Sequence, residues 1–185
     1  MTKKEKPIVF TDVDDVTALL LPTWLDKYNK DYEDNLKPEG ITDWNIHNFV
    51  TAECGTKIYD YLKDPRLYDT VFPREGAFVG VYTLRELGFR VYFATSTPIE
   101  TAGRKFYWLN DWGFDVDRRD YMEVPDKSVL NGYLMIDDRY ANVKGFHGIG
   151  CLFTEPWNSK FKWDYRVSSW EDCIENIKNG EYLYA

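Results

Sequence analysis

Short apolar runs that alternate with segments of helical periodicity are the feature that most limits the folds open to this chain of 185 residues. The runs are rich in β-branched and aromatic side chains, which is typical of strands buried on both faces. They lie at 7–11, 90–95, 133–136 and 149–154. Helical periodicity occupies 76–88, 100–113 and 170–180. This alternation predicts an α/β fold with a doubly wound, mostly parallel sheet.

One long segment breaks the alternation. Between the first predicted strand and the helix at 76–88 lie about 60 residues with helical and aromatic character but no strand pattern, and a structureless loop of that length is rare inside a compact domain. We therefore expect residues 17–72 to form a small helical cap. The core domain would then consist of residues 1–16 and 73–185, which is long enough to bury a hydrophobic core.

Charge and composition argue against several classes of function. The net charge is −8 at neutral pH, so we expect no generic electrostatic binding of polymeric DNA or RNA. The longest apolar run is too short to span a bilayer, and the charged N-terminus has no signal-peptide core, so no membrane association is expected. Three scattered cysteines without a CxxC pair favour a reducing cytoplasm and count against structural zinc.

Acidic side chains follow the first and third apolar runs. The stretch IVFTDVDDV leads an apolar segment directly into Asp12, Asp14 and Asp15, and the stretch LMIDDR ends in Asp137 and Asp138 before its arginine. Unpaired carboxylates removed from water are costly, so the arrangement needs a compensating cation. Ligands of open parallel sheets bind beyond the carboxyl ends of the strands, where these groups are expected to meet. All-oxygen ligation of this kind suits Mg²⁺.

Hydroxyl and ammonium groups accompany the carboxylates. The second apolar run ends in Thr95 and Ser96, and Lys127 lies in PDKS, between that run and LMIDDR. These groups could hold a phosphate drawn to the cation while an ionised carboxylate attacks phosphorus. A second carboxylate two positions further on could protonate the leaving alcohol and later activate water. The joint occurrence of the clusters favours phosphoryl chemistry over a series of acidic surface turns.

The order of these motifs resembles the haloacid-dehalogenase superfamily of Mg²⁺-dependent phosphohydrolases, whose nucleophile is the first aspartate of a DxD motif. The longer stretches YFATSTPIETAGRKFYWLNDWG, DKSVLNGYLMIDDR and CLFTEPWN resemble the 5′(3′)-deoxyribonucleotidase family. The resemblance covers most of the core and is weak across 17–72. It implies a haloacid-dehalogenase-like core and a phosphatase acting on small nucleotides.

The resemblance also implies roles for individual residues. Asp12 would be the nucleophile, and Asp14 the general acid and base. The phosphate would be held by Thr95, Ser96, Lys105 and Lys127. The metal would be held by the Asp12 carboxylate, the Asp14 carbonyl and the acidic pair. Which of Asp137 and Asp138 contacts the ion directly stays open, with Asp138 favoured.

Some positions depart from the family pattern. Asp15 stands where many relatives have glycine, and Pro125 stands where some have an arginine near the substrate. The resemblance therefore implies neither a nucleobase preference nor a preferred phosphate position. Trp44 and Tyr68 are the aromatic candidates for stacking on a base, and packing within the cap is an equally good interpretation of either ring.

The sequence leaves more than one function open. We favour a phosphatase that removes the 5′-phosphate, and in some substrates a 2′- or 3′-phosphate, from deoxyribonucleoside monophosphates such as dUMP or dTMP. A phosphatase of a sugar phosphate or of a nucleic-acid 3′ end would need the same residues. A receiver-like signalling module fits less well, because such modules carry the phosphorylated aspartate on a middle strand and the lysine last. Many members of the family are dimers, so a homodimer is also open.

Overall fold

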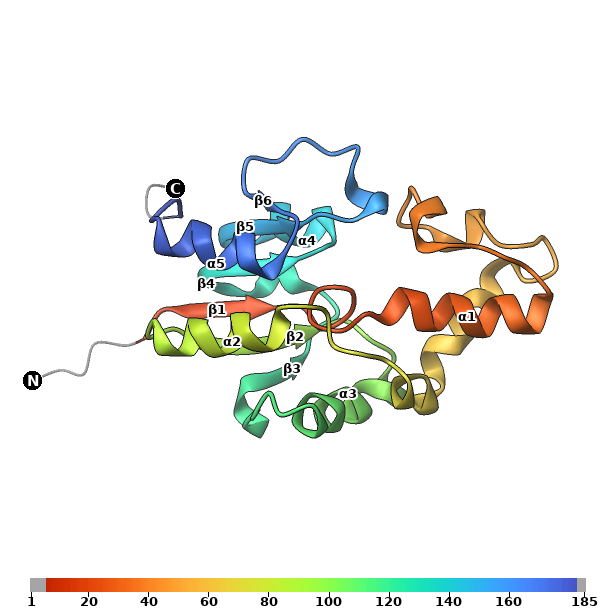
Figure 1. Cartoon of the computed structure of the whole chain (residues 1–185), viewed down its shortest axis with the longest axis horizontal. Coiled ribbons are helices and arrows are strands. Elements are labelled where there is room, and N and C mark those ends of the chain that lie inside the picture. The colour runs from red at the N-terminus through yellow and green to blue at the C-terminus, as the bar shows by residue number, and fades with distance from the viewer. Residues whose placement is uncertain (1–5, 183–185) are drawn as a thin grey trace, which may run out of the picture.

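Six parallel strands form one sheet in the computed structural model, which describes residues 6–182 (Figure 1). The strands are β1 (Ile8–Thr11), β2 (Arg90–Thr95), β3 (Tyr121–Glu123), β4 (Asn131–Asp137), β5 (His147–Phe153) and β6 (Arg166–Val167). Their order is β3-β2-β1-β4-β5-β6, with every neighbouring pair parallel. The strand order reverses at β1, and ligands of such sheets bind beyond the strand ends at this point.

The prediction of a doubly wound α/β fold is confirmed. The four predicted strands correspond to β1, β2, β4 and β5, and the last residues of each are buried. The sequence pattern missed β3 and β6, which have three and two residues. Edge strands this short cannot show a continuous or alternating apolar pattern.

Side chains on the two faces of the sheet enter different cores. Along β1, Val9 belongs to the large core, whereas Phe10 packs with Ala94, Met135 and Phe146 in a smaller cluster. This separation follows from the strand geometry, in which successive side chains point to opposite faces. Because both sets are apolar, the strands read as continuous apolar runs.

Helices cover both faces. The large core receives side chains from α2 (Ala77–Glu86), α3 (Ile99–Asp111) and α5 (Trp170–Lys178), while α4 (Tyr140–Gly145) connects β4 to β5. Three 3-10 helices join the core elements: η5 (Arg118–Asp120), η6 (Lys127–Val129) and η7 (Pro156–Asn158). Within the described residues, none of the helices has the length and apolar character needed to cross a membrane.

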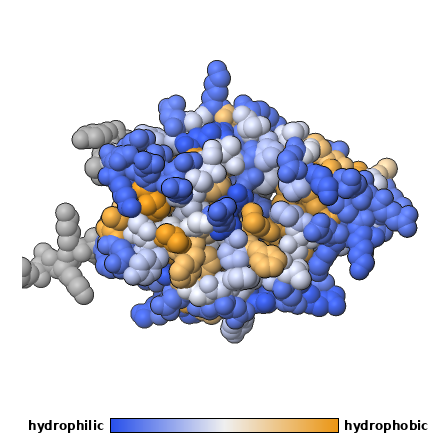
Figure 2. Space-filling view, in the orientation of Figure 1, coloured by the Kyte–Doolittle hydropathy of each residue, from blue (hydrophilic) through white to orange (hydrophobic). Residues whose placement is uncertain are grey.

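The helices α2 and α5 lie side by side over the sheet (Figure 1). Their close approach depends on Gly80, because a Cβ at this position would collide with the ring of Trp170. On the outer side of α2, Phe78 and Val79 are exposed. Figure 2 shows hydrophobic surface over this helix. Packing against α5 therefore fixes one side of α2 and leaves the other in solvent.

Residues 17–72, called the cap segment below, supply none of the six strands and extend beyond the carboxyl ends of the strands (Figure 1). The segment contains α1 (Leu20–Tyr32), η1 (Pro38–Gly40), η2 (Ile46–Asn48), η3 (Gly55–Lys63) and η4 (Pro65–Asp69). On α1, Leu21, Leu25 and Tyr28 are buried at helical spacing. The other helices are 3-10, in which side chains repeat every three residues rather than every 3.6, and η3 is the longest of them with nine residues.

Candidate active site

The chain leaves β1 in a tight turn that directs aspartates towards the rim of the sheet. The Thr17 N–H donates to the Val13 carbonyl at 3.0 Å. Trp170 on α5 donates its indole N–H to the Val16 carbonyl at 2.8 Å, which fastens the turn to the core. Asp15 has a φ of 53°, in the left-handed region where aspartate and asparagine are the best tolerated residues after glycine.

Asp15 also ties this turn to the cap segment. Its carboxylate accepts the Leu21 N–H at 2.9 Å, in the first turn of α1, and its carbonyl accepts a hydrogen bond from Arg74 at 2.7 Å. Burial raises the pKa of Asp15 to about 8, although the hydrogen bond from Leu21 opposes this shift. An aspartate at this glycine-like position therefore adds a contact that glycine could not make.

Lys127 lies between two of the predicted metal-binding carboxylates. Its Nζ is 2.8 Å from Oδ1 of Asp12 and 2.7 Å from Oδ2 of Asp137, and its side chain is 1% exposed. Burial disfavours the charged ammonium, but the two carboxylates outweigh it and raise the pKa of Lys127 above its ordinary value. The same Oδ1 of Asp12 accepts the Val13 N–H at 2.7 Å, so one carboxylate oxygen of Asp12 is held by two donors.

The neighbouring aspartates after β4 differ in how fully they are hydrogen bonded. Asp137 accepts hydrogen bonds from Lys127, from the Arg139 N–H at 2.8 Å, and from Asn142 Nδ2 at 3.1 Å to each oxygen. Asp138 accepts the Trp157 indole N–H at 2.7 Å on Oδ2. Both oxygens of Asp137 are thus occupied by protein donors, whereas Asp138 has one donor on one oxygen within the described residues.

Three of these carboxylates could hold a metal ion. One oxygen each of Asp12, Asp137 and Asp138 lie within 4.8 Å of one another, and all three side chains are buried. Burial raises the pKa of Asp12 to about 7, although Lys127 opposes the shift and Asp137 adds to it. Burial and the two neighbouring carboxylates raise the pKa of Asp138 well above its ordinary value. The excess negative charge fits a divalent cation, which would favour the ionised forms.

Asp14 is hydrogen bonded on both oxygens. Lys105 on α3 donates to Oδ2 of Asp14 and, at 3.1 Å, to the hydroxyl of Thr95. Tyr68 of the cap segment donates its hydroxyl to Oδ1 of the same carboxylate. Burial and the Asp14 charge raise the pKa of Tyr68 well above its ordinary value, so the phenol remains a neutral donor.

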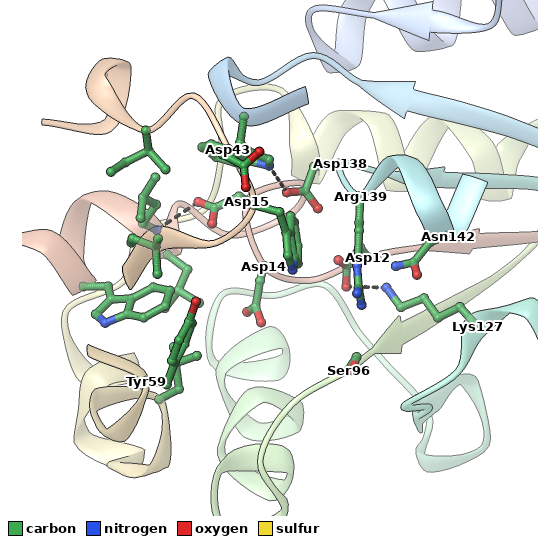
Figure 3. A pocket seen from close by; sticks show the side chains of 18 residues that line it. Asp12, Asp14, Asp15, Asp43, Tyr59, Ser96, Lys127, Asp138, Arg139 and Asn142 are labelled. Carbon is green, nitrogen blue, oxygen red and sulfur yellow. Dashed lines mark hydrogen bonds and ion pairs between the residues drawn. The ribbon is translucent and has the colours of Figure 1, made fainter. Parts of the chain in front are cut away.

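A cavity of about 300 Å³ lies between the rim of the sheet and the cap segment (Figure 3). Its polar side carries the side chains of Asp12, Asp14, Ser96, Lys127 and Asp138. The other side, called the apolar wall below, consists of Leu20, Leu21, Trp24, Ile41, Ile46, Tyr59 and Leu62. In Figure 3, Lys127 points at Asp12, and Tyr59 lies across the cavity from it. The site thus combines charged groups on one side with a hydrophobic surface on the other.

Two contacts join the cap segment to the core at the edge of the cavity. Trp44, which is 48% exposed, lies with its ring centroid 5.0 Å from the guanidinium carbon of Arg139. Next to it, Asp43 forms an ion pair with Lys160. Trp44, Asp43 and Arg139 all line the cavity, so these contacts form part of its boundary.

The predicted site residues come together around the cavity, at two depths. Those that line it are Asp12, Asp14, Trp44, Ser96, Lys127 and Asp138. Thr95, Lys105 and Asp137 are fully buried. Lys105 contacts Asp14 and Asp137 contacts Lys127 from behind the lining, while Thr95 contacts Lys105. Tyr68 also lies behind Asp14, with its side chain buried, so stacking on a base would require the ring to leave this position.

Sequence reasoning assigned no role to three residues that the structure adds. Asn142 lies five positions after Asp137, and α4 brings its amide back to that carboxylate. Trp157 lies in the stretch CLFTEPWN, which carried a family resemblance but no role. Tyr59 lies in η3, with its hydroxyl 2.9 Å from Nδ1 of His47. This 3-10 helix of nine residues repeats every three positions, so the α-helical period of 3.6 residues did not identify Tyr59 as facing the cavity.

The architecture is that of the haloacid-dehalogenase-like hydrolases, and solved structures of this class have the same fold. A hydrolase of the class from Bacillus subtilis, bound to magnesium, matches with a TM-score of 0.59 at 17% identity, covering 94% of this chain and 99% of that one. A phospho-aspartyl intermediate analogue of phosphoserine phosphatase matches with a TM-score of 0.58 at 17% identity, covering 95% and 99%. At these identities the likeness shows the fold alone.

The particular family follows from the sequence. Residues 6–180 match the family described as 5′ nucleotidase, deoxy (pyrimidine), cytosolic type C protein, and the chain belongs to this family. The 5′(3′)-deoxyribonucleotidase of Clostridium acetobutylicum is 28% identical over 177 residues, which cover 94% of this chain and 98% of that protein. The chain is therefore a hydrolase of phosphoric monoesters, and the predicted resemblance and enzyme class are confirmed.

Proposed function

We propose that this enzyme removes phosphate from deoxyribonucleoside monophosphates through an aspartyl-phosphate intermediate on Asp12, with Mg²⁺ as cofactor. The observation that carries the proposal is the environment of Asp12. One oxygen of its carboxylate is fixed by Lys127 and the Val13 N–H, and the carboxylate faces a cavity whose other side is apolar. A carboxylate held in this way can present its second oxygen to a phosphate.

The donor set around Asp12 suits a hard divalent cation. We assign the metal to the carboxylates of Asp12 and Asp138 and to the Asp14 carbonyl. The protein donors on both oxygens of Asp137 support Asp138 as the direct ligand, with Asp137 holding Lys127 behind it. When bound, Mg²⁺ would offset the carboxylate charge and polarise a phosphoryl oxygen. The similar B. subtilis hydrolase that contains magnesium supports this choice of metal.

The remaining residues divide the chemistry among them. A bond forms between the Asp12 carboxylate and phosphorus while the bond from phosphorus to the ester oxygen breaks, and Asp14 gives a proton to the leaving alcohol. Asp14 then takes a proton from the water that attacks the aspartyl phosphate, which frees phosphate and restores Asp12. Phosphate oxygens would be held by the ammonium and hydroxyl groups of Thr95, Ser96, Lys105 and Lys127.

The cap segment would recognise the nucleoside. We propose that it acts as a cap domain, residues 17–72, over a core of residues 1–16 and 73–185. A cavity of about 300 Å³ is at the small end of ligand sites, and the apolar wall suits a nucleobase and a sugar without a 2′-hydroxyl. Such a wall rejects an added hydroxyl only by about 10²-fold, so selectivity against ribonucleotides should be partial.

Two other features support the setting of this reaction. The relatives from C. acetobutylicum and B. subtilis are both named 5′(3′)-deoxyribonucleotidases, which favours a small nucleotide as the substrate. Cys54, Cys151 and Cys173 are buried free thiols, which fits the reducing cytoplasm that the family description also suggests. A homodimer remains a prediction to which no interface is assigned.

A panel of phosphomonoesters tests the proposal. We expect phosphate release from dUMP and dTMP in the presence of Mg²⁺, slower release from UMP, and none after addition of excess chelator. Faster release from a sugar phosphate, or from a 3′-phosphorylated oligonucleotide, would transfer the assignment to that substrate. A phosphoryl group that persists on the protein after acetyl phosphate treatment, without turnover, would indicate a signalling module instead.

A further inference from the structure

Tyr68 stands apart from the other aromatic residues of the cap segment, because its hydroxyl reaches a carboxylate of the sheet rim. It donates to Oδ1 of Asp14, and its side chain is only 2% exposed. The ring meets Trp108 of α3 edge to face, with centroids 5.7 Å apart at 83°. Tyr68 is not among the cavity-lining residues within the described chain, so contact with a nucleobase does not account for its burial.

The two donors on Asp14 have different second partners. Lys105, on Oδ2, also contacts the hydroxyl of Thr95 at 3.1 Å, and both residues are assigned to the phosphate above. A bound phosphate would therefore compete with Asp14 for the Lys105 ammonium. The Tyr68 hydroxyl has only Asp14 as a hydrogen-bond partner within residues 6–182. Tyr68 is thus the donor that can stay on Asp14 while Lys105 changes partner.

The position of Tyr68 is supported by two contacts that the residues following it make with α3. The Trp108 indole N–H donates to the Val71 carbonyl at 3.0 Å, and Arg104 forms an ion pair with Asp69 at 3.3 Å. Both contacts fasten η4 and the residues after it to α3, the helix that also carries Lys105. The hydroxyl of Tyr68 and the ammonium of Lys105 are therefore supported by the same helix.

We propose that Tyr68 is a positioning residue for Asp14: its hydroxyl holds one carboxylate oxygen, so that the other faces the leaving group once Lys105 has turned to the phosphate. This inference rests on the proposed role of Asp14 as general acid. It assigns to the cap segment a part in the chemistry besides binding the nucleoside, because η4 carries the group that orients the acid.

The dependence of kcat/KM on the leaving group tests the positioning role of Tyr68. The alkoxide released from dTMP needs a proton, whereas p-nitrophenolate is stable enough to leave without one. The ratio kcat/KM reports the steps up to release of the alcohol, so the later role of Asp14 as a base does not enter it. For Tyr68→Phe we expect kcat/KM to fall about tenfold with dTMP and less than about twofold with p-nitrophenyl phosphate.

Measuring both substrates on one preparation separates positioning from folding, because a smaller folded fraction lowers both values equally. Tyr61→Phe is the matched control: Tyr61 is another cap-segment tyrosine that donates to an aspartate, Asp31 at 2.6 Å, and it does not line the cavity. It should leave both values unchanged. Equal losses with both substrates, or no loss, in Tyr68→Phe would overturn the inference.

Asp14→Asn separates this inference from the proposed function. If Asp14 is the general acid, this variant should lose far more activity with dTMP than with p-nitrophenyl phosphate. A larger loss with dTMP than with p-nitrophenyl phosphate in Asp14→Asn, but not in Tyr68→Phe, would remove Tyr68 from the role and leave the proposed function intact. An equal loss of activity with both substrates in Asp14→Asn would show that Asp14 is not the general acid, and the positioning role of Tyr68 would fail with it.

Discussion

The two sides of the cavity are built in different ways. The polar side consists of side chains that leave the ends of parallel strands, and its ion pairs are buried: Lys127 is 1% exposed between Asp12 and Asp137. The apolar wall comes from α1 and short 3-10 helices, and the ion pair that joins its edge to the core is largely in solvent, with Lys160 52% exposed. Buried charge networks tolerate substitution poorly, whereas exposed contacts contribute little.

This difference suggests a division of labour. The carboxylates of Asp12, Asp14 and Asp137 at the strand ends are held in one geometry, because each of them has two or more donors. The apolar wall can vary in sequence while the chemistry is preserved, since an apolar surface of suitable shape is all that the wall must supply. Substitutions on the polar side should therefore have large effects on rate or stability, and substitutions at the wall should have small effects on substrate affinity.

The largest expected effect is that of Asp12→Asn. The amide has nearly the same size but is a poor nucleophile, so kcat with dTMP should fall by about 10³-fold or more while the fold is retained. Phosphate release measures the fall in kcat, and thermal melting shows whether the fold is retained. Asp60→Asn, at an exposed position of the cap segment, should change neither. Full activity of Asp12→Asn would show that the nucleophile lies elsewhere.

Lys127→Met should give the largest loss of stability. Removing the ammonium leaves Asp12 and Asp137 buried without their cation, and breaking a buried pair of this kind costs about 3–5 kcal/mol. Denaturant unfolding of the metal-free protein measures this loss. Lys160→Met removes an exposed ion pair and should cost less than about 1 kcal/mol. Similar losses in the two variants would contradict the contrast between the two sides of the cavity.

The pH dependence of stability should reveal the same buried charge. The ordinary pKa of an aspartate is 3.8, and that of Asp12 in the metal-free fold is about 7. Between these values the folded state binds more protons than the unfolded state, so the free energy of unfolding falls as pH rises. The stabilisation from this group is complete below pH 3.8 and is lost as pH rises through about 7.

Mg²⁺ should oppose this loss, because it binds the ionised carboxylates. We expect saturating Mg²⁺ to raise Tm by several degrees more at about pH 8 than at about pH 5. Asp12→Asn, which has no titrating carboxyl at this position, should show a smaller difference between the two pH values. An equal rise in Tm at both pH values in the unmodified enzyme would argue against a metal held by these aspartates.

The same contrast explains which parts could be predicted from the sequence. Asp12, Asp14, Asp137 and Asp138 could be located because each follows a run of buried β-forming residues, and parallel strands bring their carboxyl ends to one edge. Tyr59 could not be located, because η3 repeats every three residues and an α-helical period of 3.6 residues does not identify the face that Tyr59 shares with Leu62. The hydrogen bond from Tyr68 to Asp14 joins residues 54 positions apart, and no local pattern encodes such a contact.

The smallest expected effect is that of Trp44→Ala, at the edge of the cavity. Its contact with Arg139 is exposed, and such cation–π contacts contribute about 0.5–1 kcal/mol. We therefore expect KM for dTMP to rise about threefold with kcat unchanged, since the reacting groups keep their positions. Trp112→Ala, at a tryptophan of similar exposure that does not line the cavity, should leave KM unchanged. A fall in kcat as large as the rise in KM would mean that Trp44 also supports the reacting groups, and the separation between the two sides of the cavity would then fail.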